Sequence, residues 1–147
     1  MQIDSTAGNN FVSENEKNIE DDESVVRNVI AKCATEIYAD GRNVHVQQTG
    51  TRIKNREFMY YHRYFYPDIA GILSRLKIWQ YSYTSKKEGC EDAYCFGITD
   101  HKLDIYIKFS FVAGQNVVTV NVFSFHDPDY TMTFPYIQFK LLECGKK

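Results

Sequence analysis

The sequence predicts a two-layer α+β domain, in which N-terminal helices pack on a mainly antiparallel, five-stranded meander sheet. Apolar residues recur at three- and four-residue steps up to about residue 77, as on one side of a helix, and at two-residue steps from Ile78 onward, as on one face of a strand. The links between the later apolar runs are short, and a parallel return needs a crossover of about a dozen residues or more. With 147 residues, of which 44% are hydrophobic and 24% charged, the chain has the size and composition of one globular domain.

Residues 1–20 are predicted to form a flexible acidic tail, because they are polar and show no apolar period. The predicted domain therefore spans residues 21–147. It begins with an amphipathic helix within residues 21–40, where acidic residues precede the apolar stripe and Gly41 follows it. The apolar positions of this helix are Val26, Val29, Ile30, Cys33 and Ile37.

Polar and apolar residues then alternate briefly over residues 43–48, which predicts a short strand or an extended linker. A second helical pattern covers residues 56–77, places Phe58, Tyr61 and Phe65 on its apolar side, and contains Pro67. Proline removes a backbone donor and disfavours helix at the residue before it, so we expect either a kink or two helices. In the second case the later helix starts near Pro67 and Asp68.

Five strand-like runs follow, and the third has the most regular alternation. Its residues Ile105, Ile107 and Phe109 share one face, and we expect them to be buried with Val120 and Ile72. In the last run Pro135 cannot donate to a ladder, which predicts an edge strand or a bulge. The five predicted strands are 78–84, 93–98, 103–111, 117–126 and 130–142.

No motif of a nucleotide-driven enzyme, a serine hydrolase or a zinc protease is present, so no catalytic residue and no cofactor is predicted, and the protein is expected not to be an enzyme. The four cysteines lack metal-ligand spacing and are predicted to be free thiols, so no metal is predicted either. In two sets of residues a carboxylate could orient a histidine imidazole for acid–base chemistry. Asp and His are also common in turns, where they favour the turn backbone, so the sets are consistent with turns as well. These sets are Asp100–His101 with Asp104, and His126–Asp127 with Asp129.

Charge is distributed in blocks, and residues 41–87 hold nine basic and two acidic residues. Within this block, residues 42–66 interleave basic and aromatic side chains, which pair with phosphates and stack on bases. This pattern predicts, as an alternative function, RNA or ribosome binding. The nucleic-acid contacts would be Arg52, Lys54, Arg56, Tyr60, Arg63 and Tyr64.

The leading prediction is a non-enzymatic protein-interaction module, or adaptor, of a larger assembly that docks through the sheet face or edge. An exposed aromatic-plus-polar face is typical of protein interfaces, and its partner would be another protein or a second copy of the chain. The residues predicted on this face are Tyr106, Lys108, Asn121 and Phe123. A second alternative is a small-molecule or enzymatic cavity between helices and sheet, with tyrosines, His101 and Asp104 as its polar groups.

The polar, acidic N-terminus differs from a signal peptide, which is basic and then apolar. No window approaches the ~18 apolar residues of a membrane span. We therefore expect an intracellular protein, cytoplasmic or nuclear, that does not bind membranes.

Overall fold

The computed structural model describes residues 16–114 and 116–144, which form an α+β domain with a six-stranded, mostly antiparallel sheet. The predicted fold class is confirmed, with one strand more than expected. The strand order is β1-β3-β4-β5-β6-β2, and only the pair β2–β6 is parallel. The strands are β1 (Glu16–Ile19), β2 (Val44–Val46), β3 (Tyr81–Lys87), β4 (Ala93–Asp100), β5 (Leu103–Ala113) and β6 (Val118–His126).

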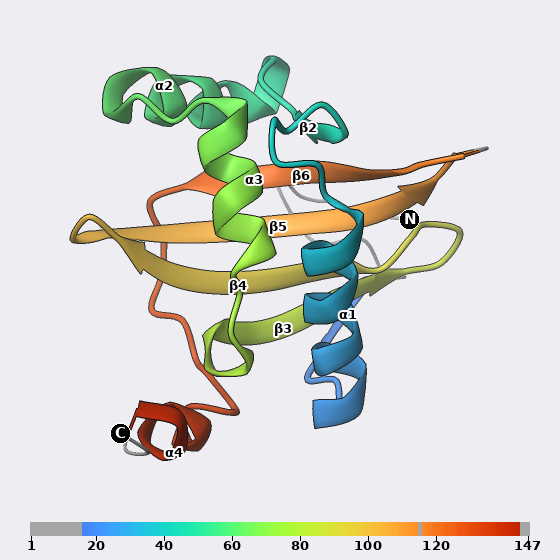
Figure 1. Ribbon diagram of the computed structural model, residues 1–147, viewed down its shortest axis with the longest axis vertical. Coiled ribbons are helices and arrows are strands. Elements are labelled where there is room, and N and C mark those ends of the chain that lie inside the picture. Colours follow the sequence, from blue (N-terminus) through green and yellow to red (C-terminus); the bar gives the residue numbers. More distant parts are fainter. Residues whose placement is uncertain (1–15, 115, 145–147) are drawn as a thin grey trace, which may run out of the picture.

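Two helices cover one face of the sheet, and a third lies along its β2–β6 edge (Figure 1). The covering helices are α1 (Glu23–Glu36) and α3 (Tyr66–Ser74), and the edge helix is α2 (Ile53–His62). A fourth helix, α4 (Gln138–Cys144), follows the sheet. Within the described ranges, none of the helices has the length and apolar character needed to cross a bilayer.

The helix boundaries follow from local signals in the sequence. The Asp22 side chain accepts a hydrogen bond from the Val25 backbone nitrogen at 3.1 Å and so caps α1. The predicted break near Pro67 is confirmed, because Pro67 lies in the first turn of α3. Asp68 accepts from the Phe65 backbone nitrogen at 2.8 Å and stabilises this start.

The core lies between the sheet and the helices α1 and α3. Ile105, Ile107, Phe109, Val120 and Ile72 all belong to one buried cluster, as the alternation of the strands predicted. Four of the five predicted strands are present, with β3 starting three residues late because residues 78–80 form a 3₁₀ turn.

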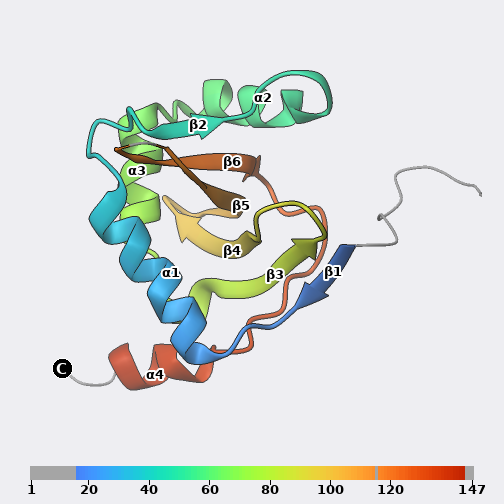
Figure 2. The same ribbon diagram turned by 90° about the vertical axis from the view of Figure 1, so that its right-hand side faces the viewer.

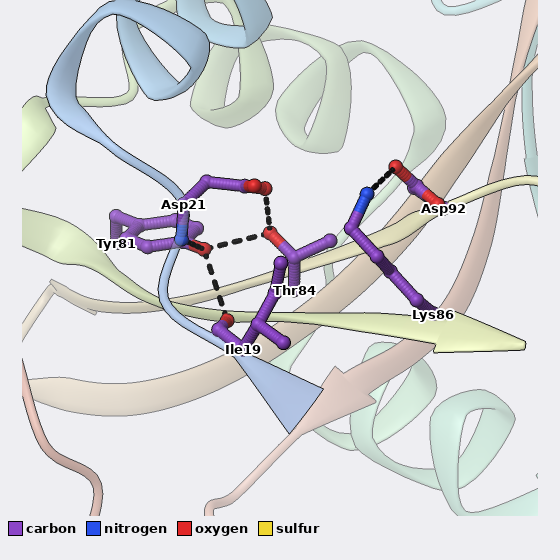
Figure 3. Close-up of polar contacts among 6 residues, drawn as sticks. All are labelled: Ile19, Asp21, Tyr81, Thr84, Lys86 and Asp92. Atoms are coloured by element: carbon purple, nitrogen blue, oxygen red, sulfur yellow. Dashed lines mark hydrogen bonds and ion pairs between the residues drawn. The ribbon is translucent and has the colours of Figure 1, made fainter. Parts of the chain in front are cut away.

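The domain begins earlier than predicted. Residues 16–19, placed by the sequence in the tail, form β1 and pair with β3, and residues 1–15 lie outside the described residues. Figure 3 shows how the chain between β1 and α1 is held: the Asp21 backbone nitrogen donates to Tyr81 Oη at 2.9 Å, and Thr84 Oγ1 donates to the Asp21 carboxylate at 2.6 Å. Tyr81 and Thr84 are fully buried, so this network ties the edge strand to the core.

The predicted fifth strand, 130–142, is wrong. After β6 the chain runs along the sheet face opposite α1 (Figure 2), and residues 138–144 form α4. A Cβ built on Gly97 would lie 2.8 Å from Met132 Sδ and 2.9 Å from Phe134 Cζ. Met132 and Phe134, which alternate along this segment, therefore pack on the face of the sheet at Gly97. In the part of the chain that the structure describes, the segment does not pair with a strand of the sheet.

Candidate binding surface at the α2–α3 junction

One face of helix α2 is covered by the sheet. Phe58 and Met59 are buried, with Phe58 packing edge-on against Phe125 of β6 at a ring distance of 5.8 Å. Tyr60 and Tyr61 are exposed and do not join the core. The Tyr61 ring packs edge-on against the neighbouring His62 at a ring distance of 4.9 Å.

Three aromatic side chains form what we call the aromatic surface: Tyr60, Tyr61 and Phe65. They are exposed to 88%, 80% and 65%, respectively. Phe65 comes from the link between α2 and α3, so the surface spans the junction of the two helices. Single exposed apolar residues are common, but three large exposed aromatic rings within six residues of chain are typical of binding sites.

The structure separates the residues that the sequence predicted to contact nucleic acid. Tyr64 is buried: its ring stacks on Phe58 at 5.8 Å, and its hydroxyl donates to Asp100 Oδ2 at 2.7 Å. Burial and this hydrogen bond raise the pKa of Tyr64. Tyr64 therefore supports the turn between α2 and α3 and does not present a stacking surface.

Two of the four basic side chains in that prediction have partners within the chain. Lys54 forms an ion pair with Asp129. Arg52 donates to Ser124 Oγ at 3.3 Å and lies over the Phe123 ring at 5.7 Å. Arg56, one helical turn before Tyr60, and Arg63, just after α2, remain exposed.

The predicted docking residues on the sheet lie on the face opposite the helices, but most of that face is covered. Tyr106 is only 8% exposed, because the chain after β6 crosses over it. Lys108, Asn121 and Phe123 are half-buried, and Gln47 Nε2 donates to Asn121 Oδ1 at 3.4 Å. This face is therefore mainly an internal contact of the domain.

A cluster of tyrosines makes that contact. The hydroxyl groups of Tyr83 and Tyr106, and of Tyr83 and Tyr130, are each 3.1 Å apart, and Cys95 Sγ is 3.5 Å from Tyr106 Oη. Burial raises the pKa values of Tyr83, Tyr106 and Cys95, so these groups stay protonated. Burial likewise raises the pKa of Cys33 to about 12, so neither buried thiol is a ready nucleophile.

A polar cavity of about 430 Å³ adjoins the aromatic surface, and we call it the junction cavity. It lies between the α2–α3 turn and the β4–β5 hairpin. Its charged or imidazole-bearing lining residues are His62, Arg63, Asp68, Arg75, Asp100 and His101. The two carboxylates already accept hydrogen bonds, Asp68 from the Phe65 nitrogen and Asp100 from Tyr64.

Neither His–Asp set forms a tight dyad in the structure. His101 Nε2 lies 3.8 Å from Asp100 Oδ2, and its side chain is 87% exposed. His126 is buried, and its Nδ1 lies 2.7 Å from the backbone oxygen of Asp127. Asp104 accepts from Thr99 at 2.9 Å and lines a different cavity, of about 420 Å³, beneath the chain that crosses the sheet. The structure therefore places His101 and Asp104 in separate cavities.

Over the described ranges, no group of three or more metal-ligating side chains could hold a metal ion. Comparison of the chain with protein-family models, curated proteins and solved structures found no match. Sequence reasoning found Tyr60 in the aromatic surface but missed Tyr61 and Phe65, because the helical pattern of 56–77 assigned both to the buried side.

Proposed function

We propose that the protein is a non-enzymatic interaction module that docks a protein partner through its aromatic surface. The exposure of Tyr60, Tyr61 and Phe65 carries this proposal. Exposed apolar area is unfavourable in water at about 25 cal/mol per Å², and aromatic rings provide the largest area per side chain. Burying these three rings against a partner would recover that free energy.

The flanking charges indicate the chemistry of the partner. Arg56, Glu57 and Arg63 are exposed in the same stretch of chain as the rings, and neither arginine forms an ion pair with another described residue. Tyrosine and arginine are the residue types most enriched among those that dominate binding energy. We therefore expect an apolar patch rimmed by acidic side chains on the partner.

A protein partner is favoured over RNA because the cationic side chains here are few. Non-specific nucleic-acid binding depends on several phosphate contacts, and Lys54 is paired with Asp129 while Tyr64 is buried. RNA remains the alternative function, supported by Arg56 and Arg63 beside exposed rings.

The test is site-specific cross-linking in the source cells, with a photoreactive phenylalanine analogue at position 61. Cross-linked protein species should form, and they should disappear when Tyr60 and Phe65 are changed to Ser. A second protein with the analogue at position 112, where Val112 is 44% exposed on β5, is the matched control and should not give the same species.

Nuclease treatment before isolation separates the two functions. Protein cross-links that survive nuclease support the protein partner. Cross-links to RNA alone, or the same protein species from positions 61 and 112, would overturn it.

A further inference from the structure

The junction cavity has the size and lining of a small-molecule site. Its volume of about 430 Å³ is within the range of ligand pockets, about 300–1,000 Å³. It exceeds the space needed for a single oxyanion, so an anionic group would leave room for an organic part.

The backbone at its rim adopts conformations that favour glycine, yet carries long side chains. Arg63 has φ 61° and His101 has φ 49°, and both line the cavity. Left-handed conformations cost most L-residues about 1–2 kcal/mol. Arg63 is the left-handed residue that ends α2, and His101 and Lys102 form the two-residue turn between β4 and β5, which are the usual places for a positive φ. These two turns place the side chains of Arg63 and His101 at the cavity.

A glycine on α3 gives a second arginine access to the same cavity. A Cβ built on Gly71 would lie only 2.9 Å from Arg75 Nη1, so the guanidinium occupies the space beside this glycine. Arg75 folds back over its own helix in this way, and it lines the cavity together with Arg63.

The two arginines of the cavity have no ion-pair partner among the described residues, whereas Asp68 and Asp100 each accept one hydrogen bond from within the chain. A guanidinium presents planar N–H groups that match the oxygens of a phosphate or carboxylate in pairs. Two such groups at one cavity suit an anion with several oxygens.

From this geometry we propose that the junction cavity binds a small phosphate monoester, whose phosphate contacts Arg63 and Arg75. His62 and His101 supply further hydrogen-bonding groups at its rim. This inference does not rest on the docking role of the aromatic surface. Arg63 flanks both sites, but Arg75 lines only the cavity, so a change at Arg75 tests the cavity while the aromatic surface is intact.

The experiment measures binding of phenyl phosphate, adenosine 5′-monophosphate and inorganic phosphate by calorimetry, with sulfate as the non-phosphate anion. We expect both monoesters to bind more tightly than inorganic phosphate, because their organic parts fill the remaining volume. The tighter of the two identifies whether the ligand is an aryl phosphate or a nucleotide. No monoester binding below a dissociation constant of about 10 mM, or equal binding of sulfate, overturns the proposal.

Glycine substitutions provide matched variants that relieve strain. Arg63→Gly should lower the affinity for monoesters at least about tenfold, the scale of a lost charge-assisted pair, without lowering the thermal midpoint. Lys102→Gly is the control, because Lys102 also has a positive φ, 68°, but does not line the cavity. Equal losses of affinity in the two variants would show a general charge effect and overturn the site. Arg75→Gln, which keeps the helix, should repeat the loss seen for Arg63→Gly.

Discussion

Asn55 accepts a hydrogen bond from the backbone nitrogen of Phe125 at 2.9 Å, so its side-chain amide bonds the edge of β6 as the backbone of a neighbouring strand would. The backbone pairing of β2 with β6 ends where Gln47 donates to the Val122 oxygen at 3.0 Å. Beyond that point Asn55 Nδ2 donates to the Phe123 oxygen at 2.8 Å, so the amide continues the hydrogen bonding along β6. Asn55 is only 1% exposed, so water cannot replace these bonds.

Asn55→Ala should therefore lower the free energy of unfolding by about 3 kcal/mol. Its third hydrogen bond goes from Nδ2 to the Gln47 oxygen at 2.8 Å, and each buried partner left unsatisfied costs about 1–3 kcal/mol. The measurement is urea unfolding, with Asn28→Ala on the exposed side of α1 as the control, which should change stability little. Equal effects in the two variants would contradict the bridging role.

Ile107→Asp should unfold the domain. Ile107 is fully buried in the core cluster, and an unpaired carboxylate there loses its hydration without gaining a partner. Circular dichroism should show loss of the cooperative melt, whereas Val112→Asp at an exposed position of β5 should melt as the parent does. A parental melting temperature for Ile107→Asp would show that this face is not the core.

Gly97→Ala should loosen the chain that crosses the sheet. The new methyl group would meet Met132 Sδ and the Phe134 ring, both at the far ends of side chains, so we expect a loss of about 1 kcal/mol and faster hydrogen exchange in residues 128–137. Adding Met132→Ala should restore part of the exchange protection, because it removes one of the two contacts. No recovery in the double variant would mean that the crossing chain is held elsewhere.

Tyr81 should make the domain sensitive to alkaline pH. Burial is the main cause that raises the pKa of Tyr81 from 10.0 to about 12, so folding favours the protonated phenol. The protonated Tyr81 phenol therefore adds to the free energy of unfolding in full below pH 10, and this stabilisation is lost as the pH rises to about 12. The free energy of unfolding should fall by up to about 3 kcal/mol over this range.

Urea unfolding at a series of alkaline pH values tests this. Tyr81→Phe should be less stable at neutral pH, because it removes the acceptor of the Asp21 nitrogen, but its stability should fall less between pH 10 and pH 12. Parallel pH curves for the two proteins would show that Tyr81 does not ionise on unfolding.

The sequence predicts those helices and strands whose apolar period reflects a single buried face of the element itself. The periods of α1 and β5 follow from one buried face each, and the break at Pro67 follows from the missing backbone donor. Alternation in residues 130–134 was misleading for a physical reason. Alternating apolar side chains also suit an extended chain that lies on another surface, and nothing local shows that Gly97 receives them.

The candidate sites depend on what covers each side chain, and this could not be predicted. Tyr60 and Tyr64 are four residues apart in one motif, yet Tyr60 is exposed and Tyr64 is buried, because α2 ends at His62 and Arg63 reverses the chain. The junction cavity combines residues of α2, α3 and the β4–β5 hairpin. Only the tertiary structure brings these segments together.

The placement of β1 and β2 at opposite edges of the sheet determines the order in which the chain can fold. Both strands precede the meander β3–β6, and their contacts span long loops: Ser85 donates to Glu16 69 residues away, and Asn43 donates to the Val118 oxygen 75 residues away. Hairpins of the meander close short loops and can form first. Each edge strand can pair only after its partner strand has formed, and its pairing costs the entropy of closing a long loop. We therefore expect folding on the slow time scale of sheet proteins, with both edges joining last.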